Sequence, residues 1–294
     1  MHMHLDGGTD PGLQRRLRWA LALTATFLVA EVVGGILANS LALLADAGHM
    51  LTDVAALALS LFVAWFSRQP AVPEKTYGYL RWEILAAFLN GAALLVVSGF
   101  IIFEAFGRLR APEPVATGLM LSVAAGGLLV NAACAWILHP LHAHSLNARG
   151  AYLHVLGDLL GSIGTVAAGA TIRFTGWQAA DPIASILVTL LIVRSSWHLV
   201  RESVDVLLEA TPSHISLGAV RGALSRVEGV SAVHDLHVWT VTSGMVAMSA
   251  HAVVPREADH QRVLRDAVAA MREFGILHCT VQIEGEPMCD NGHP

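Results

Sequence analysis

Charged residues are scarce in this chain of 294 residues. Aspartate, glutamate, lysine and arginine together make up 14% of it, against about 25% in an ordinary soluble domain. Hydrophobic residues make up 54%. This composition excludes a disordered protein and an ordinary cytosolic enzyme. The net charge of −5, with histidine counted as neutral, offers no basic field for DNA or RNA, so no nucleic-acid partner is expected.

Cysteine is also rare. Cys134, Cys279 and Cys289 are the three cysteines, too few for a disulfide framework and typical of a reducing compartment. The phosphate-binding pattern GxxxxGK[ST] is absent as well, so the sequence gives no sign of ATP-driven chemistry. Histidine, in contrast, occurs fifteen times.

Long apolar stretches occupy most of residues 17–208 and predict a membrane domain. A helix needs about 20 mostly apolar residues to cross roughly 30 Å of hydrocarbon. Six stretches meet this length, at 17–38, 41–66, 82–107, 115–138, 148–172 and 181–203. The expected fold is therefore an all-α bundle of six transmembrane helices in a lipid membrane, preceded by an N-terminal tail over 1–16.

Basic residues in the short loops predict the orientation of this bundle. One side collects Arg15, Arg16, Arg18, Arg68, Lys75, Arg81, Arg149 and Arg201. The other side collects Arg108, Arg110 and Arg173. The first side is expected to be cytoplasmic, with both termini on it. Lys75 is the single lysine among 18 basic residues, which favours a bacterial plasma membrane.

After Pro212 the hydrophobic periodicity becomes that of a small soluble domain. The pattern predicts helix, strand, strand, helix and strand over 213–228, 231–241, 245–254, 257–273 and 277–284. This αββαβ order is typical of a two-layer α+β domain with the helices on one face of the sheet. We expect a cytoplasmic C-terminal domain over 209–285 and a flexible tail over 286–294.

Two pairs of polar residues lie where a membrane helix tolerates them poorly. An aspartate at the centre of such a helix costs about 2.5–3.5 kcal/mol, and therefore suggests a function. His49 and Asp53 lie in the second stretch, and His154 and Asp158 lie in the fifth. A spacing of four places each pair on one helix face, one turn apart. Because the two stretches run in opposite directions, both pairs lie at a similar depth.

Two imidazoles and two carboxylates form a complete tetrahedral ligand set for zinc. The two carboxylates also neutralise a divalent ion in a medium of low dielectric constant. Cys134 offers the single thiolate within the spans, which argues against copper(I). Two alternatives stay open: separate hydrogen bonds within the bundle, and a haem held by His49 and His154. The haem alternative leaves Asp53 and Asp158 without a role.

Weaker polar residues lie in the same spans. Glu31 and Asp46 are candidate proton carriers or supporting groups for the predicted metal site. Asn90 and Asn131 are expected to hydrogen-bond within the helix packing, which is the commoner role of polar groups in a membrane bundle.

The stretch Glu31–Asp53, EVVGGILANSLALLADAGHMLTD, resembles the first two helices of the cation diffusion facilitator family. The loop Tyr77-Gly78 with Arg81 and Glu83, the pair His154/Asp158 and the motif VHDLHVW at 233–239 agree in order and spacing. The resemblance implies homodimeric six-helix exporters that exchange a divalent cation for protons by alternating access. It also implies a metallochaperone-like cytoplasmic domain. Histidines on both the second and fifth helices resemble the zinc-selective branch, with cadmium or cobalt also tolerated.

The same resemblance implies metal ligands outside the membrane. His234, His251 and Glu284 match positions that bind zinc at the dimer interface of the cytoplasmic domain, and His278 lies close to a further one. Arg81 and Glu209 match an ion pair that ties the membrane part to this domain. His139, His142 and His144 form a short loop that either binds metal loosely or is simply solvated.

The sequence thus predicts a secondary transporter and not an enzyme: Zn²⁺ leaves the cytoplasm in exchange for protons. Ligands must lose their protons to bind a metal, so metal and protons compete for one site, in the physiological range for imidazole. The alternatives are a membrane metal-binding or sensor protein that does not transport, and an exporter that prefers cadmium or cobalt.

Overall fold

The structure is a computed structural model that describes residues 11–66, 75–138 and 146–286. The side chains of 11–21, 52–53, 56–66, 137–138, 146–157 and 160 lie outside that description. The chain divides into two compact units. The helical unit comprises Met1–Leu61 and Leu89–Leu199, and the tail unit comprises Phe62–Phe88 and Val200–Pro294.

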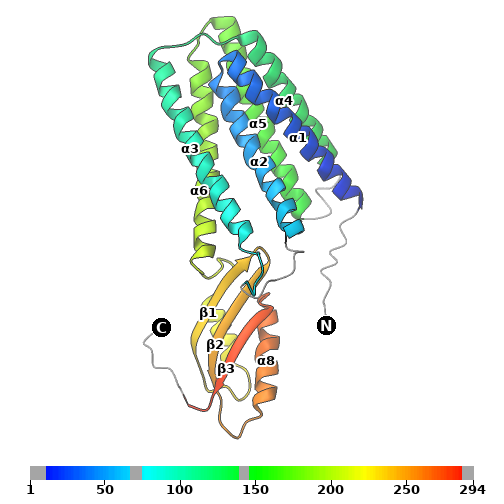
Figure 1. The fold of residues 1–294 in the computed structure, drawn as a ribbon, viewed down its shortest axis with the longest axis vertical. Helices are drawn as coiled ribbons and strands as arrows, with labels where there is room; N and C mark the ends of the chain where they lie inside the picture. The colour runs from blue at the N-terminus through cyan, green and yellow to red at the C-terminus, as the bar shows by residue number, and fades with distance from the viewer. Residues whose placement is uncertain (1–10, 67–74, 139–145, 287–294) are drawn as a thin grey trace. The chain divides into compact units, whose positions relative to one another are not determined.

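Long helices make up the first two thirds of the described chain (Figure 1). They are α1 (Pro11–Ala38), α2 (Leu41–Phe66), α3 (Trp82–Arg110), α4 (Thr117–Leu138), α5 (Leu146–Thr175) and α6 (Ala180–Leu207). Among the described residues, α3, α4 up to Trp136, and α6 are long and apolar enough to cross a membrane. Ala22–Ala38 and Leu41–Leu51 are shorter apolar helical segments. Each helix coincides closely with one of the stretches predicted from hydropathy.

Contacts in the helical unit show how its helices run relative to one another. Helix α4 packs against both α1 and α5. Ala42 and Leu43, near the start of α2, share a buried apolar cluster with Ala168 and Ile172, near the end of α5. Further along, the two helices meet again through His49 of α2 and Asp158 of α5. Helices α2 and α5 are therefore antiparallel.

A buried carboxylate closes the N-terminus of α2. Asp181, in the first turn of α6, accepts a hydrogen bond of 2.5 Å from the Ser40 hydroxyl. It also accepts bonds from the backbone amides of Leu41 at 2.8 Å and Ala42 at 3.2 Å. Free amides at a helix start need acceptors and favour negative charge. One aspartate in the first turn of α6 thus caps the N-terminus of α2 and joins the two helices.

The tail unit ends in a small mixed sheet with two helices. Its elements are α7 (Leu217–Ser225), β1 (Ala232–Thr242), β2 (Met245–Val253), α8 (His260–Arg272) and β3 (His278–Glu284). The strands lie in the order β1-β2-β3, with β1 antiparallel and β3 parallel to β2 (Figure 1). Ser216 and Asp259 cap α7 and α8 through their side-chain oxygens.

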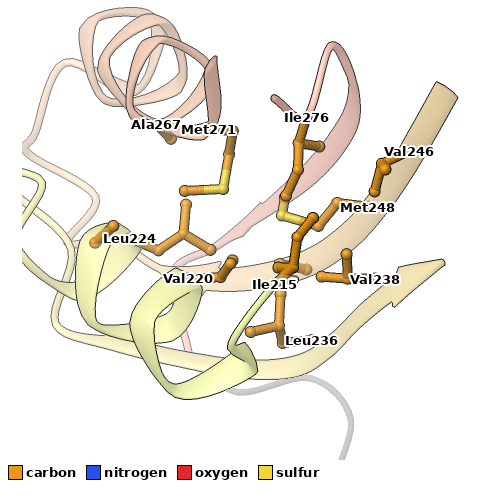
Figure 2. Packing of buried hydrophobic residues seen from close by; sticks show 12 residues of the cluster. Ile215, Val220, Leu224, Leu236, Val238, Val246, Met248, Ala267, Met271 and Ile276 are labelled. Atoms are coloured by element: carbon orange, nitrogen blue, oxygen red, sulfur yellow. The ribbon is translucent and has the colours of Figure 1, made fainter. Parts of the chain in front are cut away.

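Both helices pack on one face of this sheet. Val220 and Leu224 of α7 and Met271 of α8 form a buried apolar cluster with residues of the strands (Figure 2). Ala250 of β2 belongs to the same cluster. Because side chains alternate along a strand, the residues next to Ala250 point to the opposite face. This open face carries the polar side chains described below.

Candidate metal centres

The structure brings His49 and Asp158 together in the helical unit. His49 Nε2 of α2 lies 2.9 Å from Asp158 Oδ1 of α5. Asp158 is buried, and 26% of the His49 side chain is exposed. An imidazole and a carboxylate from two different helices therefore meet, as the matching sequence pairs predict.

The side chains of Asp53 and His154 lie outside the described residues, but their backbone is helical. Position 53 is one turn beyond His49, and position 154 is one turn before Asp158. Four residues of helix rise about 6 Å. Because α2 and α5 are antiparallel, both positions lie in the same direction from the His49–Asp158 contact. The backbone thus places positions 53 and 154 on the same side of the His49–Asp158 contact along the two helices.

Further acidic groups are buried near this contact. Asp46 of α2 interacts electrostatically with His49 and Asp158, and Glu31 of α1 interacts with Asp46. Glu31 is fully buried, and its carboxyl oxygens have no hydrogen-bond partner within the described ranges. Asn131, in contrast, donates to the Ser162 hydroxyl at 2.9 Å, which confirms its predicted packing role.

A second cluster lies at one end of the sheet in the tail unit. The side chains of His234, His251 and Glu284 each offer one ligand atom, and these atoms lie within 4.8 Å of one another. Glu284 Oε2 is 3.1 Å from His234 Nε2, and Glu284 Oε1 is 3.0 Å from His251 Nδ1. Glu284 is 1% exposed. The structure therefore gathers the three residues that the family resemblance picked out.

Strand register and a β-bulge build this cluster. His234 pairs with His251, whereas His237 pairs with Ser249, so β1 has one residue more than β2 between the two pairs. Such a bulge reverses the alternation of side chains. His234 and His237 therefore share the open face, although a regular strand would place them on opposite faces. At the bulge, Asp235 has a φ of 49°, a left-handed conformation that aspartate tolerates.

The donor set suits a metal ion such as zinc. His251 Nδ1 is buried and has no hydrogen-bond partner among the described residues. The neighbouring Glu284 oxygen is close but not aligned for a hydrogen bond. Two imidazoles and a carboxylate within reach of one point are ordinary zinc ligands, and a further ligand would complete a tetrahedron.

Three neighbours of the cluster were not predicted as functional. Gln282 donates from Nε2 to Glu284 Oε1 at 2.8 Å. Asp235 Oδ1 lies 3.0 Å from His237 Nε2, and Asp235 Oδ2 lies 3.6 Å from His251 Nε2. The hydrogen bond with His237 holds the pKa of the Asp235 carboxyl below its usual value. The motif HDLH contains Asp235 and His237, but the β-bulge that orients their side chains could not be predicted from the sequence.

His278 does not join the cluster. It begins β3 and pairs with Ala247, whereas the cluster lies at the other end of the strand, where Val253 pairs with Glu284. Its Nε2 instead lies 3.3 Å from the Tyr77 hydroxyl. The loop histidines His139, His142 and His144 fall outside the described residues.

The segment before α3 contacts the rest of the tail unit. Arg81 forms a 2.8 Å ion pair with Glu209, as the resemblance implied. Glu83, in the first turn of α3, accepts hydrogen bonds from the hydroxyls of Thr242 at 2.5 Å and Ser243 at 2.9 Å. These bonds fix the turn between β1 and β2 to the start of α3.

Comparison with known proteins agrees with this architecture. The family model described as "Cation efflux transmembrane domain" matches residues 17–208. The model described as "Cation efflux protein, cytoplasmic domain" matches residues 212–286. The zinc transporter ZitB of Escherichia coli is 46% identical over 277 residues, which are 93% of this chain and 88% of that protein.

Two further matches come from other bacteria. A "cadmium, cobalt and zinc/H(+)-K(+) antiporter" of Bacillus subtilis is 41% identical over 290 residues, 97% of this chain and 92% of that protein. The metal-bound C-terminal domain of the CzcD transporter from Cupriavidus metallidurans is 30% identical. It covers 24% of this chain and 99% of that one, with a TM-score of 0.23.

Apolar helices with a partly buried histidine–aspartate contact, together with the family matches, define an integral membrane transporter for metal cations rather than an enzyme. The chain belongs to the cation efflux family, also called the cation diffusion facilitator family.

Proposed function

We propose that this chain exports Zn²⁺ from the cytoplasm in exchange for protons by alternating access. The observation that carries the proposal is the 2.9 Å contact between His49 Nε2 and Asp158 Oδ1. A polar pair in a membrane bundle is costly and is retained for function. The contact joins α2 to α5, so a change in the packing of these helices would assemble or open the site.

Four ligands complete the proposed transport site: His49, Asp53, His154 and Asp158. The antiparallel register of α2 and α5 supports the inclusion of positions 53 and 154, because both lie one turn from the observed contact. Two imidazoles and two carboxylates saturate a tetrahedral ion. The two carboxylates also cancel its charge, which lowers the cost of holding a divalent ion in hydrocarbon.

Zinc is the proposed cargo for chemical and comparative reasons. Nitrogen and oxygen ligands suit zinc, whereas copper(I) selects thiolates. A relative with 46% identity is named a zinc transporter. Another relative's name includes cadmium and cobalt beside zinc, so these two ions are the alternative cargoes.

Competition at one site provides the proposed coupling to protons. Metal binding requires neutral imidazole and ionised carboxylate, so each bound ion displaces protons. The pKa of imidazole is about 6.5 in water, so modest changes of pH shift this competition. In the proposed cycle, Zn²⁺ displaces protons on the cytoplasmic side and protons displace Zn²⁺ on the other.

We further propose that α1–α6 all span a bacterial plasma membrane, with both termini in the cytoplasm. The proposed transmembrane domain covers 17–208 and the cytoplasmic domain covers 209–285, close to the two family matches. His234, His251 and Glu284 would bind a regulatory or structural zinc ion in a domain that joins two copies of the chain. Their convergence at one end of the sheet supports this part of the proposal.

Uptake of ⁶⁵Zn into proteoliposomes tests the proposal. With the cytoplasmic face outward, an acidic lumen should accelerate accumulation several-fold, and an ionophore that collapses the pH gradient should remove the acceleration. Uptake that is indifferent to the gradient would contradict proton exchange. Zinc that binds to the protein without accumulating in the lumen would instead indicate the sensor alternative.

A further inference from the structure

We propose that Asp235 is the positioning residue of the tail metal centre, defined as His234, His251 and Glu284. In this proposal the Asp235 carboxylate accepts the Nε2–H of His251 and thereby directs His251 Nδ1 at the ion. The inference rests on the metal binding by this centre proposed above, and it assigns a role to a residue outside the ligand set.

The His251 ring lies between two carboxylates. Its Nδ1 is 3.0 Å from Glu284 Oε1, and its Nε2 is 3.6 Å from Asp235 Oδ2. A neutral imidazole has one N–H and one lone pair, so it cannot donate to both carboxylates. Nδ1 is the buried nitrogen that lacks an aligned hydrogen-bond partner in the described structure. A cation held between Nδ1 and Glu284 resolves this conflict, and Nε2 then keeps the proton.

A histidine that binds metal usually donates its other N–H to a carboxylate or carbonyl. This outer bond fixes the tautomer and the ring orientation and raises the basicity of the ligand. Asp235 is placed to accept it. A charge-assisted hydrogen bond is about 2.7–2.9 Å long, so the observed 3.6 Å separation closes by a side-chain movement of less than about 1 Å.

Two local features aim Asp235 at His251. The β-bulge adds one residue to β1 between His234 and His237, and Asp235 takes the left-handed conformation there, with a φ of 49°. Its Oδ1 lies 3.0 Å from His237 Nε2, which leaves Oδ2 toward His251. The chain of contacts therefore runs from His237 through Asp235 to His251 and the ion.

The Asp235 side chain is expected to contribute little to the stability of the fold. Its side chain is 38% exposed. Exposed ion pairs contribute little to stability. Removal of its charge should therefore leave the fold intact and affect the bound metal instead.

The test uses the full chain in detergent with Asp158→Ala, which removes the proposed transport site. Zinc affinity is measured by competition with a chelator, and the visible spectrum of bound Co²⁺ reports ligand geometry. Asp235→Asn should weaken zinc binding about 10- to 100-fold and alter the Co²⁺ spectrum, and Asp235→Glu should partly restore both. His237→Gln should cause a smaller loss. Asp266→Asn, an exposed acid on α8, is the matched control and should change neither quantity.

Unchanged zinc affinity and an unchanged Co²⁺ spectrum in Asp235→Asn would overturn the inference. So would a loss that Asp235→Glu does not relieve and that accompanies a lower melting temperature, because that result assigns Asp235 to folding. Glu284→Ala in the same background separates the two proposals. If it still binds zinc as the parent does, the tail metal centre itself is wrong. If it loses the ion while Asp235→Asn keeps it, only the role of Asp235 fails.

Discussion

The helical unit and the tail unit each place imidazole against carboxylate at about 3 Å, but they do so by different means. His49 and Asp158 meet because α2 and α5 are antiparallel and packed. His234, His251 and Glu284 meet because three strands are held in one register with a bulge in β1. The first arrangement depends on the packing of two helices, and the second depends on a hydrogen-bonded sheet.

This difference suggests that the two sites have different functions. A site between two helices opens when the helices move, as release of a cargo requires. A site whose ligands come from adjacent strands keeps its geometry while the sheet is intact, which suits an ion that stays bound. Loss of a ligand should therefore stop transport in the helical unit, whereas in the tail unit it should mainly remove a bound ion.

The largest expected effect on transport is that of Asp158→Ala. The variant removes a proposed ligand, the carboxylate that lies 2.9 Å from His49 Nε2, so ⁶⁵Zn uptake should fall at least about 100-fold, equivalent to roughly 2.7 kcal/mol. Glu104→Gln, an exposed acid of α3 that pairs with Arg108, is the control and should transport normally. Normal uptake by Asp158→Ala would contradict the proposal that the helical unit contains the transport site and the tail unit does not.

A second variant tests the packing on which the helical site depends. Asp181→Ala leaves the Ser40 hydroxyl and the amides of Leu41 and Ala42 without their acceptor. A hydrogen bond to a charged group contributes about 1.5–3 kcal/mol, so the free energy of unfolding should fall by about 3 kcal/mol. Thermal unfolding in detergent measures this change. Asp181→Asn keeps an acceptor and should lose less; equal losses would contradict the capping role.

Glu284→Ala should separate metal content from transport. Without this carboxylate the purified chain should lose one zinc ion per protomer, while ⁶⁵Zn uptake falls by less than about tenfold, or 1.4 kcal/mol. Metal analysis and the uptake assay give the two values. If uptake falls as far as in Asp158→Ala, the tail metal centre belongs to the transport path, and the proposal that the two sites have different functions is wrong.

The smallest effect concerns the reactivity of Cys279 in β3. Burial raises the pKa of its thiol above the usual value, so less of the reactive thiolate is present at neutral pH. In a Cys134→Ser, Cys289→Ser background, iodoacetamide should react more slowly than with a free thiol at pH 7, and the rate should rise as the pH approaches the raised pKa. Unfolding in urea should abolish the difference. Equal rates before unfolding would show that the strand is not packed as described.

The contact between His49 and Asp158 could be predicted from sequence, because a spacing of four fixes one helix face without knowledge of the partner. His49 and Asp158 were found in this way. The tail centre needed the family resemblance, since strand register and a bulge decide which residues share a face. The same limit explains why His278 was included and Asp235 missed. Asp181 is the first residue of the stretch 181–203, but its hydrogen bonds to the start of α2 depend on tertiary packing.

X-ray absorption at the zinc edge tests the central claim most directly. The sample is the Glu284→Ala variant loaded with one equivalent of zinc, so that the proposed transport site alone binds it. We expect four nitrogen or oxygen ligands at about 2.0–2.1 Å, with imidazole scattering, and loss of the signal when Asp158→Ala is added. A sulfur shell near 2.3 Å, or zinc that stays bound in the double variant, would contradict a cargo site between α2 and α5.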